Sequence, residues 1–275
     1  MSWLNELPAD YQLIIVHDVQ VRKFTRDEVI NFEKLHSNLK ISEGYFGGPG
    51  SARNEGLSLV QSKQVAFWDS DDLPNIKNFN QVLDTFIESS FEIAACGYTK
   101  IDVKHQSIKT NIPSVSNNLF HIAKEVALWR FMFKTSLLKD IRFPNILLGE
   151  DQVFISRVLK DFNKFTTYKK IVYNYRYNSN NQLTSASSKS KLIKPIIDEL
   201  FIGIVSENRN QQILNKLLVI RLCITLLLQI ESLTQFRTLV TAVFHLILGD
   251  LISLKFNLLI YFRFALYILW TRLRN

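Results

Sequence analysis

Short apolar segments of strand type alternate with helix-forming segments through the first hundred residues of the chain. The strand-type segments are residues 12–17, 39–42, 64–68 and 92–98. The helix-forming segments are residues 25–37, a segment that follows the glycine-rich turn at 47–54 and runs to about residue 61, and residues 75–89. Strands that are separated by helices usually pair in parallel, and the helices then cover both faces of the sheet. This order therefore predicts an α/β fold with a mainly parallel sheet.

After about residue 100 the pattern changes. We expect a polar hairpin or loop at residues 101–118, an aromatic and basic helix at 124–139, a strand at 171–177 and a polar loop at 178–191. From about residue 192 the sequence is helical and strongly apolar. The chain is thus expected to contain a first domain over residues 1–190 and a helical region over residues 191–275.

Composition narrows the classes of function. The chain has 275 residues, of which 47% are hydrophobic, enough for one α/β domain with a smaller appendage. Cys96 and Cys223 lie far apart in apolar surroundings, so we expect buried free thiols rather than a disulfide or a metal site. The net charge is +8, but the Lys and Arg residues are scattered, which argues against a nucleic-acid partner.

The apolar C-terminal region has features of a membrane surface. Arg221, Thr225 and Gln229 recur every four residues and form a narrow polar stripe on a broad apolar helix. No window reaches about 18 uncharged apolar residues, so a membrane-spanning helix is not expected. Aromatic and cationic residues flank the apolar segments, as they do at membrane–water interfaces. We expect peripheral contact with the cytoplasmic membrane, and a helical core appendage or an oligomer interface is the alternative.

Carboxylates gather where the strand at residues 64–68 ends, at Asp69, Asp71 and Asp72. Three such groups repel one another unless a cation or a shell of hydrogen bonds compensates. Oxygen ligands of this kind suit Mg²⁺ or Mn²⁺, ions that commonly carry a diphosphate. The other interpretation is a solvated turn that leads into the next helix, with Pro74 near its first position.

Further motifs extend this pattern along the chain. An apolar strand ends at Asp18, the run Gly-Pro-Gly-Ser-Ala-Arg-Asn-Glu-Gly occupies residues 48–56, and Gly-Glu-Asp and Tyr-Arg stand at residues 149–151 and 175–176. In this order and spacing the chain resembles the family 2 glycosyltransferases, which have the Rossmann-like glycosyltransferase A fold. The resemblance covers about residues 10–190.

The resemblance implies a site for a nucleotide diphosphate sugar, with UDP as the expected nucleotide. Asp71 and Asp69 would hold Mn²⁺ or Mg²⁺ on the diphosphate, with Asp69 nearer the sugar or ribose. Asp72 is expected to cap the helix at residues 75–89 instead of binding the metal. Asp18 is expected to contact the base or the ribose.

Two arginines are further candidates for the donor site. Arg53 matches the arginine of the family's Ala-Arg-Asn element and could reach a donor phosphate, the sugar or the carboxylates at residues 69–72. A structural ion pair with those carboxylates is the alternative. Arg176, with the polar loop that follows it, could close over the diphosphate as a lid, and a plain surface loop is the alternative.

The resemblance also implies a catalytic pair. Asp151 would act as the general base that takes the proton from the acceptor hydroxyl, and Glu150 would orient it or bind the acceptor. The alternative is that both acids only stabilise the N-terminus of a helix that starts near residue 151. Trp129 either stacks under the acceptor sugar or packs in the core.

The chain departs from the family in one respect. Family members normally open with an apolar strand that is central in the sheet, whereas this chain begins inside the following helix, so that strand is expected to be absent.

Two candidate functions remain. The first is an inverting, metal-dependent glycosyltransferase that moves a sugar from its nucleotide donor to a glycan or lipid-linked acceptor, in capsule, lipopolysaccharide or other surface polysaccharide synthesis. The second is a non-catalytic, membrane-associated subunit that retains the fold.

Overall fold

The computed structural model describes residues 6–8, 10–19, 27, 38–113, 119–160, 162–177, 189–206, 208–228, 235–243, 265–266 and 268–269. The strands are β1 (Leu13–Asp18), β2 (Leu39–Gly44), β3 (Gln64–Ala66), β4 (Leu73–Pro74), β5 (Ile93–Asp102), β6 (Ile108–Asn111), β7 (Phe131–Lys134) and β8 (Phe165–Tyr177). The helices are α2 (Pro49–Ser58), α3 (Ile76–Glu88), α4 (Leu119–Lys124), α5 (Glu150–Val158), α6 (Lys189–Ile204) and α7 (Arg209–Leu227). Short 3₁₀ helices are η3 (Leu128–Arg130), η4 (Thr135–Leu138) and η5 (Phe162–Lys164).

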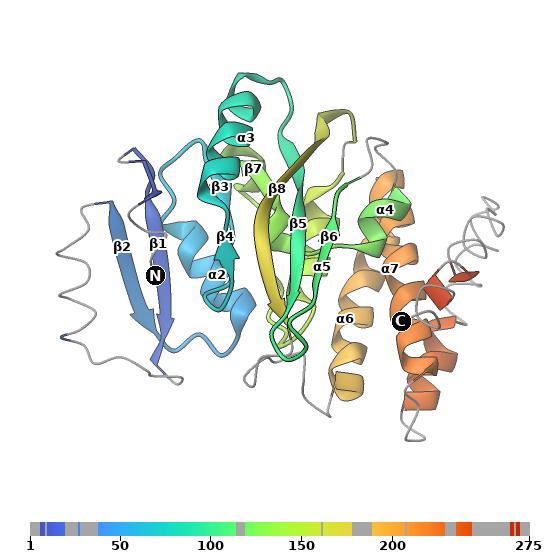
Figure 1. The fold of residues 1–275 in the computed structure, drawn as a ribbon. Helices are drawn as coiled ribbons and strands as arrows, with labels where there is room; N and C mark the ends of the chain where they lie inside the picture. Colours follow the sequence, from blue (N-terminus) through green and yellow to red (C-terminus); the bar gives the residue numbers. More distant parts are fainter. Residues whose placement is uncertain are drawn as a thin grey trace.

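The described strands form two sheets (Figure 1). β1 and β2 pair in parallel, and the larger sheet has the order β3-β7-β5-β8-β4, with β6 paired to β5. In the larger sheet only β5 and β8 are parallel, and the pairs β3–β7, β5–β7, β4–β8 and β5–β6 are antiparallel. The predicted α/β class is confirmed, but the larger sheet is mixed rather than mainly parallel, because β7 enters it antiparallel between β3 and β5.

The strand β7 was not expected from the sequence. The pattern predicts a helix over residues 124–139, but the structure has η3, then β7, then η4. Phe131, Met132 and Phe133 are each at most 1% exposed, so both faces of β7 are buried. A strand that is buried on both faces is apolar at consecutive positions and lacks the alternation that marks a strand. For this reason the prediction of a helix is wrong.

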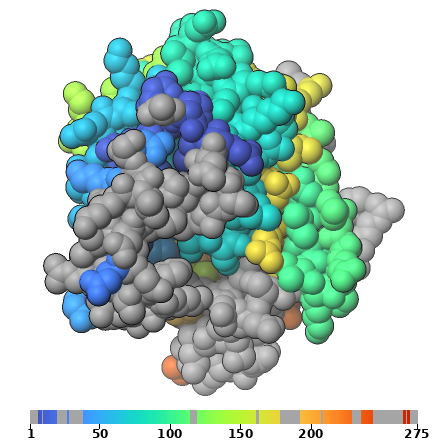
Figure 2. Space-filling model, turned by 60° about the vertical axis from the view of Figure 1, so that its left-hand side comes forward, coloured from blue at the N-terminus to red at the C-terminus, as the bar shows by residue number. Residues whose placement is uncertain are grey.

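The predicted helix at residues 75–89 is present as α3, but its cap differs from the prediction. The Asn75 side chain accepts a hydrogen bond from the Asn78 backbone N–H at 3.0 Å, so Asn75, not Asp72, caps α3. The apolar side of α3 packs with one face of the sheet, in a cluster that includes Phe86 and Cys96. Figure 2 shows this side of the molecule, with the end of β8 (yellow) between the α3 region (teal) and the β5–β6 hairpin (green).

The helices α5, α6 and α7 cover the other face of the sheet (Figure 1). Alternate residues of β5 enter the two clusters: Ala94 packs with α3, and Ala95 packs with the α5–α7 side. Arg221, from the predicted polar stripe, donates to the backbone oxygens of Ala123 at 2.7 Å and Lys124 at 3.1 Å. Helix α7 therefore shares a core with the strands, and its arginine fixes it against α4.

Other expectations have mixed outcomes. Cys96 and Cys223 are free and buried, as predicted. None of the described helices combines the length and the apolar character that crossing a bilayer needs. The expected helix at residues 25–37 and loop at 178–191 fall largely outside the described residues.

Candidate active site

Arg53 joins three segments that lie far apart in the sequence. It projects from α2 and pairs with Glu150, the first residue of α5, and its Nη2 donates to Asp69 Oδ1 at 2.7 Å just beyond β3. The Arg53 side chain is 18% exposed and that of Glu150 is 7% exposed. Burial lowers the pKa of Arg53, but the charges of Asp69 and Glu150 outweigh burial and raise it. These contacts match the predicted alternative, in which Arg53 forms a structural ion pair with the carboxylates.

Two residues next to Arg53 in sequence explain its position. Asn54 donates to the Phe143 backbone oxygen at 3.0 Å and accepts from the Phe143 N–H at 2.8 Å, which clamps α2 to the segment before α5. At Gly50, a Cβ would lie 2.6 Å from the Pro144 oxygen, so only glycine allows this approach. The sequence reasoning missed Asn54, although its place directly after Arg53 in the motif was a signal.

The turn before α5 sets the direction of the two predicted catalytic acids. Gly149 has a φ of 75°, in the left-handed region that favours glycine, and a Cβ there would lie 2.6 Å from Ile196 Cδ1. Glu150 and Asp151 then form the first turn of α5, where carboxylates interact favourably with the helix dipole. The predicted helix-terminus role is therefore present, and it is compatible with a role in catalysis.

Asp151 has the electrostatic properties of a base that works near neutral pH. Burial and the adjacent Glu150 charge raise its pKa to about 7, although Arg53 acts to lower it. The hydrogen bond that its carboxylate accepts from a protein group comes from the Gln152 N–H of its own helix, at 2.8 Å. General bases are most effective when their pKa lies near the working pH.

The acidic turn after β3 is fastened to β8. The Tyr173 hydroxyl accepts a hydrogen bond from the Asp69 N–H at 3.0 Å and donates to Asp72 Oδ2 at 2.9 Å. The Arg176 N–H donates to Asp72 Oδ1 at 2.7 Å. Burial raises the pKa of Asp72 to about 7 against these hydrogen bonds. Because these bonds engage the Asp72 carboxylate, Asp72 does not cap α3. The role of Tyr173 was not predicted from the sequence, because the strand pattern at residues 171–177 does not distinguish it from its neighbours.

Asp71 differs from its neighbours because it points to solvent. It is exposed, whereas the Asp69 side chain is 34% exposed and Asp72 is 4% exposed. Within the described residues, no group of three or more His, Cys, Asp or Glu side chains is placed to hold a metal. Mg²⁺ sites are commonly built from one or two carboxylates completed by substrate phosphates and water, so Asp71 and Asp69 fit a metal that arrives with its nucleotide.

The remaining candidates, Asp18 and Trp129, come from β1 and η3. Asp18 ends β1 in the smaller sheet, beside the ion pair of His17 Nδ1 with Glu43 Oε1 at 3.1 Å, so its predicted contact with the base stays a prediction. Trp129 is 8% exposed and stacks on Tyr173 at 4.7 Å between ring centroids. These contacts agree with core packing, which is one of the two roles predicted for Trp129.

Comparisons with known proteins identify the family and the fold. The model of "Glycosyl transferase family 2" matches residues 2–159. The chain is 29% identical over 192 residues to the minor teichoic acid biosynthesis protein GgaB of Bacillus subtilis, covering 65% of this chain and 21% of that protein. It is 28% identical over 184 residues to a poly(ribitol-phosphate) beta-glucosyltransferase of Bacillus spizizenii, covering 61% and 27%. The chain thus spans about a quarter or less of the length of these curated relatives.

Solved structures share the fold. The structure of S. aureus TarS 1–349 in complex with UDP-GlcNAc superposes with a TM-score of 0.67 at 19% identity, covering 89% of this chain and 74% of that one. At this identity the likeness shows the fold alone, and it confirms the predicted glycosyltransferase A-type architecture. Because the family model covers more than half of the sequence, the chain belongs to glycosyl transferase family 2.

Proposed function

We propose that this protein is a glycosyltransferase that moves a sugar from a nucleotide diphosphate donor, with UDP as the nucleotide, to a teichoic acid-type cell-surface polymer. The observation that carries the proposal is the bridge by Arg53 between Asp69, on the donor side, and Glu150, beside the proposed base. The TarS structures that share the fold hold UDP-GlcNAc or UDP. Relatives of this chain are named for teichoic acid and poly(ribitol-phosphate) chemistry, which favours a polyol-phosphate acceptor over lipopolysaccharide.

The proposed reaction is a single displacement with inversion. Asp151 takes the proton of an acceptor hydroxyl while that oxygen forms a bond to the anomeric carbon. The bond between the anomeric carbon and the diphosphate oxygen breaks at the same time, and the nucleotide diphosphate leaves with that electron pair. Glu150, held by Arg53, lies beside Asp151, and its charge helps to raise the pKa of Asp151 to about 7.

A divalent ion, Mn²⁺ or Mg²⁺, is proposed for the donor side. Asp71 is the main protein ligand because it is exposed, whereas Asp69 already pairs with Arg53. When bound, the ion neutralises charge on the leaving diphosphate. The Tyr173 and Arg176 hydrogen bonds hold the turn in place from the β8 side. The predicted lid role of Arg176 remains a proposal, supported by its position at the end of β8 next to this turn.

The test is release of nucleotide from a set of UDP-sugars, with Mn²⁺ or Mg²⁺ and a poly(ribitol-phosphate) or poly(glycerol-phosphate) acceptor. We expect acceptor-dependent turnover that falls strongly in both Asp71→Asn and Asp151→Asn. Asp140→Asn, an exposed aspartate outside the site, is the matched control. Turnover that is unchanged in both site variants would refute the mechanism.

A second candidate is a non-catalytic subunit that retains the fold. It is favoured by the separation of β1 and β2, which carry Asp18, from the larger sheet that carries the acidic turn. Calorimetry with UDP and Mn²⁺ separates the two candidates. Metal-dependent binding that is lost in Asp71→Asn supports the enzyme, and no binding supports the subunit.

We also propose that the protein attaches peripherally to the cytoplasmic face of the membrane. In the helical segment at residues 235–243, Phe236 and Val240 are each 50% exposed and Val243 is 40% exposed. Their spacing of four and three residues places them on one side of a helix. Flotation with anionic vesicles tests this, with Phe236→Ser expected to reduce the bound fraction and neutral vesicles as the comparison.

A further inference from the structure

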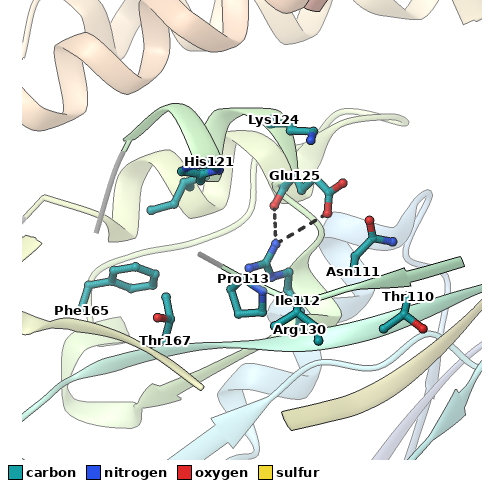
Figure 3. Close-up of a pocket in the computed structure, with 11 residues that line it drawn as sticks. Thr110, Asn111, Ile112, Pro113, His121, Lys124, Glu125, Arg130, Phe165 and Thr167 are labelled. Atoms are coloured by element: carbon teal, nitrogen blue, oxygen red, sulfur yellow. Dashed lines mark hydrogen bonds and ion pairs between the residues drawn. The ribbon is translucent and has the colours of Figure 1, made fainter. Parts of the chain in front are cut away.

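A polar cavity is lined by residues outside the proposed active site. It has a volume of about 220 Å³ and opens between β6, α4, the end of η3 and the start of β8 (Figure 3). None of the acids or arginines proposed above for donor binding and catalysis lines it. The lining residues used here are Asn111 from β6, Lys124 from α4, Glu125 directly after α4 and Arg130 from η3.

Two hydrogen-bond donors in the wall of the cavity have no partner in the described structure. They are Arg130 Nε and Asn111 Nδ2, and both atoms are buried. The Arg130 side chain as a whole is only 8% exposed. Buried donors without acceptors are costly, because each has lost its hydrogen bonds to water. Such groups therefore favour an acceptor other than the described residues.

Glu125 balances only part of the positive charge around the cavity. It accepts a hydrogen bond from the Tyr98 hydroxyl and lies 3.9 Å from Arg130 Nη1. Lys124 lines the cavity as well, and Lys100 lies near enough to interact with Glu125. Burial lowers the pKa of Lys100, the charge of Glu125 acts to raise it, and the charges of Lys109 and Lys124 act to lower it. The cavity lining thus includes the two cations Arg130 and Lys124 and the carboxylate of Glu125, a set of charges that would attract an added anion.

We propose that this cavity binds a phosphate group. A phosphate offers only acceptor atoms, arranged as a tetrahedron, and the donors come from separate elements: β6, η3 and α4. Figure 3 shows the Arg130 guanidinium between Glu125 and the β6 side of the cavity, with Asn111 beside it. A ligand with a carboxylate in place of the phosphate would suit the site less well, because a planar group would meet these donors from one side only.

The phosphate can come from two sources that share this chemistry. One is a repeat of a polyol-phosphate acceptor, and this choice rests on the proposed function. The other is free phosphate or a small phosphomonoester. A row of aromatic rings in contact, Tyr98, Trp129 and Tyr173, runs from Glu125 to the acidic turn. An acceptor repeat in the cavity would therefore bind the domain beside the packed layer that supports the active site.

The first experiment is calorimetric titration of the full chain with inorganic phosphate in metal-free buffer, where the carboxylates of the active site repel the ligand. Asn111→Asp places a negative charge at an unpartnered donor without changing size, and Lys124→Gln removes one cation. Each is expected to weaken binding roughly tenfold or more, as loss of a charge-assisted hydrogen bond does. Lys104→Gln, exposed in the turn between β5 and β6 and outside the cavity lining, is the matched control and should change affinity less than twofold.

The second experiment replaces phosphate by a short ribitol-phosphate oligomer. Binding at least tenfold tighter than phosphate, and weakened in Asn111→Asp, assigns the cavity to the acceptor polymer. Equal affinity, also weakened in that variant, assigns it to free phosphate. No binding of either ligand, or binding that neither Asn111→Asp nor Lys124→Gln affects, overturns the proposal. Failure of the proposed function would appear instead as absent UDP binding and turnover, which these metal-free titrations do not depend on.

Discussion

Two aspartates with similarly raised pKa values, the buried Asp72 and the half-buried Asp151, have different surroundings. Burial raises the pKa of both Asp72 and Asp151 to about 7. Asp72 accepts hydrogen bonds from the Tyr173 hydroxyl and the Arg176 N–H, which tie it to β8. Asp151 accepts one from the next residue of its own helix. The comparison shows that a raised pKa alone does not identify a base, because a carboxylate whose oxygens are already engaged by distant strands is placed to hold the fold.

Asp151→Asn should have the largest effect on activity. An amide cannot take the proton of the acceptor hydroxyl, so we expect a loss of kcat of about 10²- to 10⁴-fold. The variant should be at least as stable as the parent protein, because it removes a buried charge beside Glu150. Steady-state turnover and thermal melting measure the two effects. Full activity in this variant would move the base elsewhere.

Arg53→Met should have the largest effect on stability. The substitution keeps the apolar stem but leaves the Glu150 carboxylate, 7% exposed, without its cation. We expect a loss of about 2–3 kcal/mol, below the range for fully buried pairs because Arg53 is 18% exposed. Denaturant unfolding at pH 7 measures it. Removing Arg53 also removes a charge that lowers the pKa of Asp151, so that pKa should rise further.

Asp72→Asn tests the structural half of the comparison. The variant places an amide against the Tyr173 hydroxyl and the Arg176 N–H, so one hydrogen bond is lost and a buried donor is introduced. We expect a loss of about 1–3 kcal/mol in the free energy of unfolding. Asp71→Asn, at the exposed position directly before Asp72, is the matched control and should leave stability unchanged while weakening the metal dependence of turnover. Equal stability losses in both variants would contradict the distinction.

The pH dependence of turnover should report Asp151. The carboxyl must be ionised to act as a base, so kcat should rise about tenfold per pH unit below pH 7 and level off above it. Stability should run the other way. A carboxyl whose pKa is raised from its ordinary value of 3.8 to about 7 binds protons more tightly when folded, so its contribution to stability weakens as the pH rises between these values. A rate profile that is flat from pH 5 to 8 would exclude Asp151 as the base.

Motif order pointed to residues that contact one another, but not to the residues that support them. The resemblance named Arg53, Asp69 and Glu150 as site candidates, and the structure places Arg53 in contact with both acids, although 97 positions separate Arg53 from Glu150. Local pattern failed for β7, whose two buried faces remove the alternation of a strand. It also failed for Tyr173, because a hydrogen bond to a residue 104 positions away leaves no local periodicity. The partner of a buried carboxylate depends on strand register, and register is a property of the folded sheet.

Tyr173→Phe should give the smallest effect. It tests the support that the Tyr173 hydroxyl gives to the acidic turn. The ring remains and still stacks on Trp129, but the hydroxyl that accepts from the Asp69 N–H and donates to Asp72 is lost. We expect a loss of about 1 kcal/mol in stability. If the hydroxyl positions Asp69, the apparent affinity for UDP with Mn²⁺ should also fall, whereas a merely structural role would leave donor affinity unchanged. Tyr168→Phe, a partly buried tyrosine of β8 on the same side of the sheet, is the control for loss of a hydroxyl. Donor binding that falls equally in both variants would show that the effect comes from β8 as a whole rather than from the bond to the acidic turn.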